Sequence, residues 1–318
     1  MVTETAEGAA MYLDRRALDR AGIRDSELRE AYEVCRKLLF GSEDGALLIT
    51  STLLLPPHKR PHLWALGAFH WYTDTLLDSG DPAMRAERYR AWCSRVDTDL
   101  EVGQSGHPVC AAMLHTARTW GITMADIRAG IEGYRMDLAI TEYPTYADLE
   151  RYIDAVDGPC VRMGLCVLEP LTGEAYGRTL ALATAMQLID ILYDMAEDAR
   201  LGRTYVPLED LHAFGLTLTD LCRGGLTPAL RALVRHEVAR VRALWAYANG
   251  VVNVVEPGCR MWLERIVAYY TAVLDDLERR DYDVTTGKPR LGDARMLVGV
   301  RRPRRSSRQN LVGQSHVH

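Results

Sequence analysis

Three aspartates recur at intervals of four residues in an otherwise apolar stretch of the sequence. The segment LIDILYDMAEDARLGRTYVPLEDL, residues 188–211, carries Asp190, Asp194 and Asp198. In a helix, residues four apart lie on one face, one turn above another, so the three carboxylates would point the same way. Like charges at this spacing repel, and burial would raise their pKa values unless a cation neutralised them. The pattern therefore predicts a site that binds a cation.

A second pair of aspartates lies on another apolar stretch. Asp74 and Asp78 are one turn apart in YTDTLLD, and their flanks are apolar and aromatic. Two helices with such residues on their inner faces can aim carboxylates at each other across a cavity. Mg²⁺ prefers oxygen ligands and is usually held by carboxylates together with substrate phosphates. Because such ions stabilise the charge of a departing pyrophosphate, the chemistry expected is ionisation of an allylic diphosphate.

Each pair also has a simpler interpretation, which is a solvated helix face or a salt bridge. Two pairs with apolar flanks in one chain favour a functional site, because carboxylates are rarely buried without partners. Downstream, Arg200 and Arg203 could hold the pyrophosphate, since a guanidinium contacts phosphate oxygens in a bidentate way. The alternative for these arginines is ion pairing with Glu197 or Asp198 at the same helix end.

The segment AMQLIDILYDMAEDARLGRTYVPLEDL resembles the second signature of the squalene/phytoene synthase family, Q-x-x-N-I-x-R-D-x-x-E-D-x-x-x-G-R-x-Y-x-P. The stretch LLPPHKRPHLWALGAFHWYTDTLLD is similar to the approach to the family's first D-x-x-x-D motif. IRAGIEGYRMDLAITEYPTYADLERYIDAVDG and YYTAVLDDLERRDYDV resemble its middle segment and its last helix. The residues that match the second signature are Gln187, Ile191, Asp194, Glu197, Asp198, Gly202, Arg203, Tyr205 and Pro207.

The resemblance implies a single-domain, all-α isoprenoid synthase fold with a central cavity, and a small-molecule substrate, farnesyl or geranylgeranyl diphosphate. It also implies Mg²⁺ between the two aspartate motifs. The metal ligands expected are Asp74, Asp78, Asp190, Asp194 and Asp198, and all but Asp190 are also expected to be catalytic. The substrate contacts expected are Arg200, Arg203, Tyr205, Gln187, Trp71, Tyr193 and Asp137.

The sequence departs from the family pattern mainly where a diphosphate would be bound. Loss of phosphate donors suits an enzyme that holds one diphosphate rather than two, and aromatic faces can stabilise carbocations. The alternative cause of the departures is sequence drift. The departures are Trp71 and Tyr193 for arginines, Asp190 for asparagine, GALLIT for a serine-rich stretch at 45–50, and Asp157-Gly158-Pro159 for alanine-glycine-threonine.

The favoured hypothesis is therefore a terpene synthase that ionises one prenyl diphosphate and lets the cation cyclise in a dry cavity. The first alternative is head-to-head condensation of two prenyl diphosphates to a phytoene-like or squalene-like product. Only a squalene-type product would require NADPH. The second alternative is an inactive relative that serves as a scaffold, and the presence of both aspartate motifs argues against it.

The elements that must position these residues are nearly all helices. Apolar residues recur at helical spacing, whereas alternating strand patterns with β-branched residues are almost absent. Glycine and proline breaks separate the helical stretches. We expect helices at about residues 26–40, 59–78, 82–102, 108–121, 124–140, 145–168, 179–201, 228–250 and 258–280.

The 318-residue chain is 48% hydrophobic, enough for a large core, and we expect one domain over residues 1–299 and a basic, disordered tail over 300–318. This tail would be a solubilising end or would contact an anionic membrane surface.

The net charge of -5 argues against nucleic acid as a partner. Seven cysteines without a C-x-x-C pair predict reduced core thiols in a cytoplasmic protein. We find no secretory signal and no apolar run of membrane-spanning length, and the sequence does not indicate the oligomeric state.

Overall fold

The computed structural model describes residues 15–41, 51–78 and 81–288. Within these ranges the chain is almost entirely helical and has no strand, only two isolated β-bridges, Glu142 with Thr204 and Pro170 with Val255. The all-α prediction is confirmed. Two features named above lie outside the described residues. They are GALLIT at 45–50, where the family has a serine-rich stretch, and the predicted tail at 300–318.

Nine longer helices in the described part of the chain correspond to the nine expected from periodicity, mostly within a few residues at each end. Short helices and 3-10 turns connect them. The longer helices are α2 (Ser26–Phe40), α4 (Arg60–Asp78), α5 (Arg85–Val102), α6 (Pro108–Trp120), α7 (Met124–Gly133), α8 (Tyr146–Leu168), α9 (Ala175–Arg200), α12 (Pro228–Tyr247) and α13 (Arg260–Arg279). The shorter elements are α10 (Leu208–Ala213), α11 (Leu218–Arg223), η1 (Thr52–Leu54), η2 (Pro82–Met84), η3 (Tyr134–Leu138), η4 (Val251–Asn253) and η5 (Pro257–Cys259).

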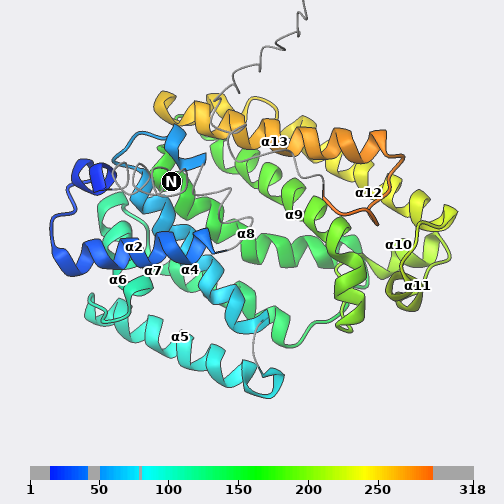
Figure 1. Cartoon of the computed structure of the whole chain (residues 1–318), viewed down its shortest axis with the longest axis horizontal. Coiled ribbons are helices and arrows are strands. Elements are labelled where there is room, and N and C mark those ends of the chain that lie inside the picture. The colour runs from blue at the N-terminus through cyan, green and yellow to red at the C-terminus, as the bar shows by residue number, and fades with distance from the viewer. Residues whose placement is uncertain (1–14, 42–50, 79–80, 289–318) are drawn as a thin grey trace, which may run out of the picture.

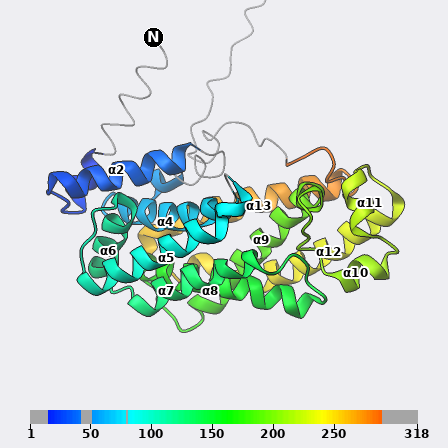
Figure 2. The same cartoon turned by 90° about the horizontal axis from the view of Figure 1, so that it is seen from below.

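Helices α8 and α9 run through the middle of the molecule (Figure 1). Helix α8 packs on α7, α4 and α9, and α9 packs in turn on α12 and α11. Both views place α2 and α6 at one end of the molecule and α10 and α11 at the other (Figure 2). Two apolar clusters form the core, and Tyr134 packs against both of them. The helices that carry the two aspartate motifs, α4 and α9, therefore share α8 as a common support.

Helix α9 is long and apolar enough to cross a membrane, by length and composition only. Half of its most apolar window is buried inside the protein, where α9 contacts α8, α11 and α12. It also carries the three aspartates at Asp190, Asp194 and Asp198. These are the features of a central helix in a folded domain, in which neighbouring helices supply the apolar surroundings.

All seven cysteines are free thiols, four of them buried and three half-buried. No disulfide joins them. Burial raises the pKa of Cys35 and of Cys160 to about 12, because the thiolate would lose its hydration. Such thiols behave as apolar core groups.

The helix expected over residues 124–140 ends at Gly133 and continues as η3. A Cβ at Gly133 would lie 2.3 Å from the carbonyl oxygen of Ala155, so the backbones of α7 and α8 are in direct contact there. The chain changes to the tighter 3-10 geometry right after this contact. As a result, Tyr134 and Asp137 are placed beside α8 rather than on a straight continuation of α7. The short helices α10 and α11 were not expected, because the segment that contains them is rich in turn residues.

We predict that Gly133→Ala lowers the free energy of unfolding by roughly 1–3 kcal/mol, because the added methyl group would overlap the α8 backbone. The matched control is Gly164→Ala on α8, where an added Cβ meets no atom within 4 Å. That substitution should raise stability by up to about 1 kcal/mol through helix propensity. Chemical denaturation of the two variants measures both effects, and equal stabilities would contradict the close contact.

Candidate active site

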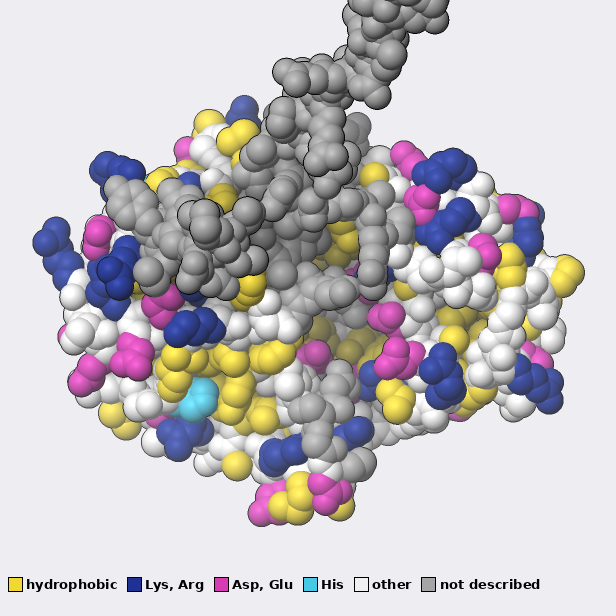
Figure 3. Space-filling view, in the orientation of Figure 1, with side chains coloured by type: hydrophobic (Ala, Val, Ile, Leu, Met, Phe, Trp, Pro, Cys, Tyr) yellow, Lys and Arg dark blue, Asp and Glu magenta, His cyan; other side chains and the backbone are white. Residues whose placement is uncertain are grey.

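The two predicted aspartate motifs lie on the two helices that flank α8. Asp74 is half-buried on α4. Asp78 is the last residue of α4, and its side chain lies outside the part of the structure that is described. In the space-filling view, a recess with hydrophobic and acidic side chains lies near the middle of the molecule (Figure 3). The carboxylates of α4 and α9 are thus carried by helices around the centre of the fold.

The three aspartates of α9 differ in their surroundings. Asp198 is buried, Asp190 is half-buried and Asp194 is exposed. Nζ of Lys288 lies 2.7 Å from Oδ1 of Asp190, and Nε of Arg203 lies 2.8 Å from Oδ1 of Asp198. Two of the three carboxylates therefore have a cationic side chain as counter-charge. For Arg203, the ion pair that the sequence left as an alternative is the one that forms.

The described aspartates of the two motifs do not form a compact cluster of ligand atoms. A set of three groups whose ligand atoms lie within 4.8 Å of one another occurs instead at Asp210, His236 and Glu237. That set already has a cation, because Nη1 of Arg240 lies 3.2 Å from Asp210 and forms an ion pair with Glu237. The Arg240 guanidinium also lies over the Tyr146 ring, 3.8 Å from its centroid. We interpret this set as an internal ion-pair network between α10 and α12.

Tyr134 of η3 connects the two sides of the site. Burial raises the pKa of its phenol, and the negative charges of Asp74, Asp157 and Asp137 raise that pKa further. The phenol is therefore near carboxyl groups of α4, η3 and α8, and it remains protonated at neutral pH. Tyr134 was not among the residues expected from the sequence, although it lies in the segment that resembles the family.

Asp157 of α8 is a further carboxyl group at this site. It is half-buried, and its Oδ2 atom is enclosed and has no hydrogen-bond partner among the described residues. Burial raises its pKa to about 7, and the nearby charges of Asp190 and Asp154 contribute. Loss of hydration is the largest cause of the raised pKa of Asp157. The signal in the sequence is the departure from the family pattern at residues 157–159.

Asp137, an expected substrate contact, is held by two tyrosines. The hydroxyl groups of Tyr152 and Tyr205 donate hydrogen bonds to its two carboxylate oxygens, each at 3.0 Å. Burial raises the pKa of both phenols, so they remain donors at neutral pH. The Arg203 guanidinium lies 5.5 Å from the centroid of the Tyr205 ring. Asp137 is therefore fixed by α8 and by the segment that follows α9.

The remaining predicted residues are spread along α4 and α9. Trp71 of α4 is half-buried and packs against the first apolar cluster. Tyr193 of α9 is half-buried, its Oη atom is enclosed without a hydrogen-bond partner within the described ranges, and burial raises its pKa to about 12. Gln187 is half-buried on α9, and Arg200 is exposed at the end of that helix. The two aromatic side chains thus lie on the helices that carry the aspartate motifs and pack against different apolar clusters.

Lys288 is a second residue that sequence reasoning missed. It follows α13 by several residues and reaches back to Asp190 of α9, a contact that helical periodicity does not reveal. Its positive charge also acts on the Tyr193 phenol, together with that of Arg280. The sequence signal for this contact is only that a basic residue lies in the polar segment after the last helix.

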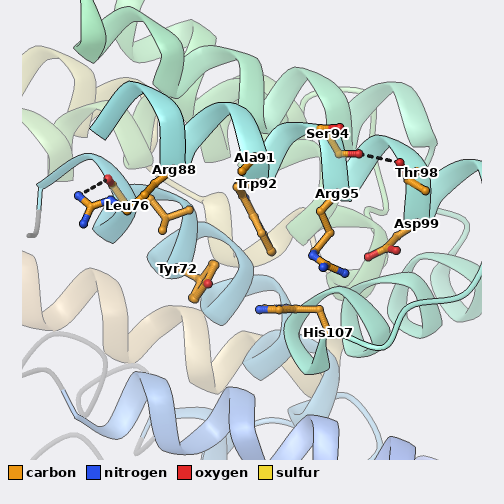
Figure 4. A pocket seen from close by; sticks show the side chains of 10 residues that line it. All are labelled: Tyr72, Leu76, Arg88, Ala91, Trp92, Ser94, Arg95, Thr98, Asp99 and His107. Carbon is orange, nitrogen blue, oxygen red and sulfur yellow. Dashed lines mark hydrogen bonds between the residues drawn. The ribbon is translucent and has the colours of Figure 1, made fainter. Parts of the chain in front are cut away.

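A separate pocket of about 600 Å³ lies between α4 and α5. Figure 4 shows Tyr72 of α4, Trp92 and Arg95 of α5, and His107 pointing toward it. None of the predicted site residues lines this pocket. It therefore does not belong to the site formed by the aspartate motifs.

The oxygen donors on α4 and α9 fit a hard divalent cation. Asp74, Asp190 and Asp194 are carboxylates on helices that share α8, and carboxylates with waters and phosphates are the usual ligands of Mg²⁺. Because these groups are not clustered tightly, a phosphate-bearing ligand would complete the coordination. The fold and these donors define the class of the protein as an all-α isoprenoid synthase.

Comparisons with known proteins agree with this class. Residues 48–298 match the model of the family described as squalene/phytoene synthase. The phytoene synthase of Arthrospira platensis is 31% identical over 271 residues, which cover 80% of this chain and 86% of that protein. The crystal structure of squalene synthase HpnC from Alicyclobacillus acidocaldarius superposes with a TM-score of 0.73 at 29% identity, covering 83% of this chain and 99% of that one.

The bifunctional protein CrtB/UppS of Streptomyces coelicolor is 34% identical over 224 residues, 70% of this chain, and the match spans only 39% of that longer protein. The chain belongs to the squalene/phytoene synthase family. It is an enzyme of the prenyltransferase type that acts on prenyl diphosphates. The resemblance noted in the sequence is thereby confirmed, and the scaffold alternative is set aside.

We predict that Asp157 makes the stability of the protein depend on pH. Its ordinary pKa of 3.8 is raised to about 7 on folding, so the folded state binds more protons than the unfolded state between these values. Stability contributed by the protonated group is therefore lost as pH rises from about 4 to above about 7. Asp157→Asn lacks this loss, and its melting temperature should exceed that of the wild type by more at pH 8 than at pH 4.

Thermal unfolding at the two pH values measures the difference directly. Asp154→Asn, an exposed aspartate less than one turn away on α8, is the control and should show a much smaller change with pH. A difference between Asp157→Asn and wild type that is the same at pH 4 and pH 8 would refute the elevated pKa.

Proposed function

We propose that this protein joins two prenyl diphosphates head to head with release of pyrophosphate. The observation that carries the proposal is the pair of helices α4 and α9, which carry Asp74 and the α9 aspartates and both pack on α8 in a chain of this family. The names of the relatives, phytoene synthase and squalene synthase, favour this reaction. Cyclisation of one substrate, which we expected first from the sequence, has less support.

In the proposed mechanism, Asp74, Asp78, Asp190 and Asp194 would hold Mg²⁺, and Asp198 would support them from its buried position. When bound, the metal supplies positive charge that stabilises the leaving pyrophosphate. The apolar walls exclude water, so that a carbocation survives long enough to react with the second substrate. The faces of Trp71 and Tyr193 stabilise positive charge by cation–π attraction.

The residues that are held by hydrogen bonds or ion pairs position the substrate and take no part in bond making or breaking. Asp137 keeps its direction because Tyr152 and Tyr205 both donate to it. Arg203 fixes Asp198 by an ion pair, and Arg200, exposed at the same helix end, contacts the pyrophosphate. Preorganised groups of this kind lose no reorganisation energy at the moment of reaction. Gln187 would contact the substrate from α9.

Lys288 places a positive charge beside Asp190, the residue that stands where the family pattern has an asparagine. The Lys288–Asp190 ion pair neutralises the extra carboxylate that this chain carries. The two charged atoms lie 2.7 Å apart, and both side chains are partly exposed, so the pair keeps some contact with water. An aspartate in place of the family's asparagine at position 190 is therefore compatible with a working site.

The substrate class is geranylgeranyl or farnesyl diphosphate. NADPH would be required only if the product were of the squalene type. A cytoplasmic location and a contact of the basic tail with an anionic membrane surface remain predictions, as does the absence of nucleic acid among the partners.

A specific observation keeps cyclisation as the second candidate. Trp71 and Tyr193 stand where the family usually has arginines, and both are half-buried aromatic side chains at the site. Fewer phosphate donors with more aromatic surface would suit a site for one diphosphate. The two candidates differ in the mass of the product, so one experiment separates them.

We predict that the purified protein with Mg²⁺ converts geranylgeranyl or farnesyl diphosphate to a hydrocarbon with twice the carbon number of the substrate. Each substrate is incubated separately, with and without NADPH, and products are identified by mass spectrometry. A product with the carbon number of one substrate would contradict condensation and support cyclisation.

Asp74→Ala and Asp194→Ala should each lower the rate roughly 100-fold or more, because each removes a charge that stabilises the transition state. Glu101→Ala, which removes an exposed carboxylate on α5, is the matched control and should leave the rate unchanged. Retention of the wild-type rate by both aspartate variants would contradict the proposed metal site.

A further inference from the structure

Isoprenoid coupling that ends in an alkene requires a proton acceptor. The last carbocation loses a proton from a neighbouring carbon, and the electron pair of that C–H bond becomes the new C=C bond. Cyclisation that ends in an alkene has the same requirement, whereas a reductive, squalene-type ending takes a hydride from NADPH instead. The active site must therefore contain a base within reach of the cation, unless the pyrophosphate itself accepts the proton.

The carboxylates of the two aspartate motifs have other tasks. Asp190 and Asp198 are in ion pairs with Lys288 and Arg203. The proposed function commits Asp74 and Asp194 to the metal, and both also have interactions within the protein. None of these groups is well placed to accept a proton in a dry part of the site.

Three other polar side chains of the site, Asp137, Tyr134 and Tyr193, are already hydrogen-bond acceptors or remain protonated. Asp137 accepts hydrogen bonds from Tyr152 and Tyr205. The phenols of Tyr134 and Tyr193 have raised pKa values, so they are protonated at neutral pH and have no charge to offer. These groups can stabilise a nearby cation but do not take its proton.

Asp157 differs from all of these groups. Its Oδ2 atom is enclosed by protein and accepts no hydrogen bond from any described residue. Its charge acts on Tyr134, which Asp74 of α4 also approaches, and its own pKa responds to Asp190 of α9. Asp157 lies on α8, the helix on which both α4 and α9 pack, and it is less exposed than Asp194.

We propose that Asp157 is the general base that removes the proton from the final carbocation. In this step the carboxylate of Asp157 binds the proton, the C–H electron pair forms the alkene, and the carboxyl group later passes the proton to pyrophosphate or water as the products leave. The proposal rests on the proposed function, because it requires a reaction that forms a carbocation and ends by proton loss.

Two features of the surroundings suit Asp157 to this role. Desolvation makes a buried carboxylate a stronger base than an exposed one, which its raised pKa reflects. The neighbouring Cys160 on the same helix is a half-buried thiol whose pKa is raised to about 12, so it is protonated and does not compete for the proton. A buried carboxyl group with an unpaired oxygen also lowers stability, and such a cost is common at functional sites.

The test compares Asp157→Asn, Asp157→Ala and wild type with Mg²⁺ and geranylgeranyl diphosphate, measuring pyrophosphate release and hydrocarbon product separately. We expect both variants to release pyrophosphate within about 3-fold of wild type, because ionisation does not use Asp157. The alkene formed by wild type should fall roughly 100-fold, the usual contribution of a general base, and alcohols from water capture should take its place. Asp154→Asn, less than one turn away and exposed, is the control and should give the wild-type product.

Three outcomes would overturn the proposal. The same alkene at the wild-type rate from both variants would show that another base, such as the pyrophosphate, accepts the proton. A parallel fall of pyrophosphate release and alkene would place Asp157 in the ionisation step instead. A wild-type product that forms only with NADPH would remove the proton-loss step. A wild-type protein that ionises no prenyl diphosphate would instead refute the proposed function, and thermal unfolding confirms that each variant is folded.

Discussion

The charge of the carboxylates on two apolar helices that share α8 as a support is the constraint on which the rest of the structure depends. Asp74 on α4 and the aspartates on α9 approach a common region because both helices pack on α8. Arg203 and Lys288 neutralise two of these charges from within the chain. The remaining charge would be neutralised by Mg²⁺ with a diphosphate, which links the stability of the site to the ligand that it binds.

The packing of α7 against α8 determines how the other side of the site is built. Because Gly133 lets the two backbones touch, the chain turns into η3 and places Tyr134 and Asp137 against α8. Tyr152 and Tyr205 then hold Asp137, and Tyr134 lies near Asp157. One close backbone contact thus places several polar side chains that are far apart in the sequence.

Much of the fold could be predicted from the sequence, because helical periodicity and glycine or proline breaks are local signals. The longer helices follow that pattern, whereas η3 depends on a tertiary contact at Gly133 and was not expected. The motif aspartates could be assigned to helices, but their burial could not. Asp198 is buried and Asp194 exposed because α9 has different neighbours along its length. The partner of Asp190 lies far away in the sequence, and the enclosed oxygen of Asp157 is a property of the assembled core.

The measurement that tests the central claim most directly is anomalous X-ray diffraction from crystals soaked with Mn²⁺ and a thiodiphosphate analogue of geranylgeranyl diphosphate. Mn²⁺ stands in for Mg²⁺, and its anomalous signal locates each ion. We expect metal peaks between Asp74 of α4 and the aspartates of α9, bridged by the diphosphate. Peaks at Asp210, His236 and Glu237 alone, or none near the analogue, would contradict the account.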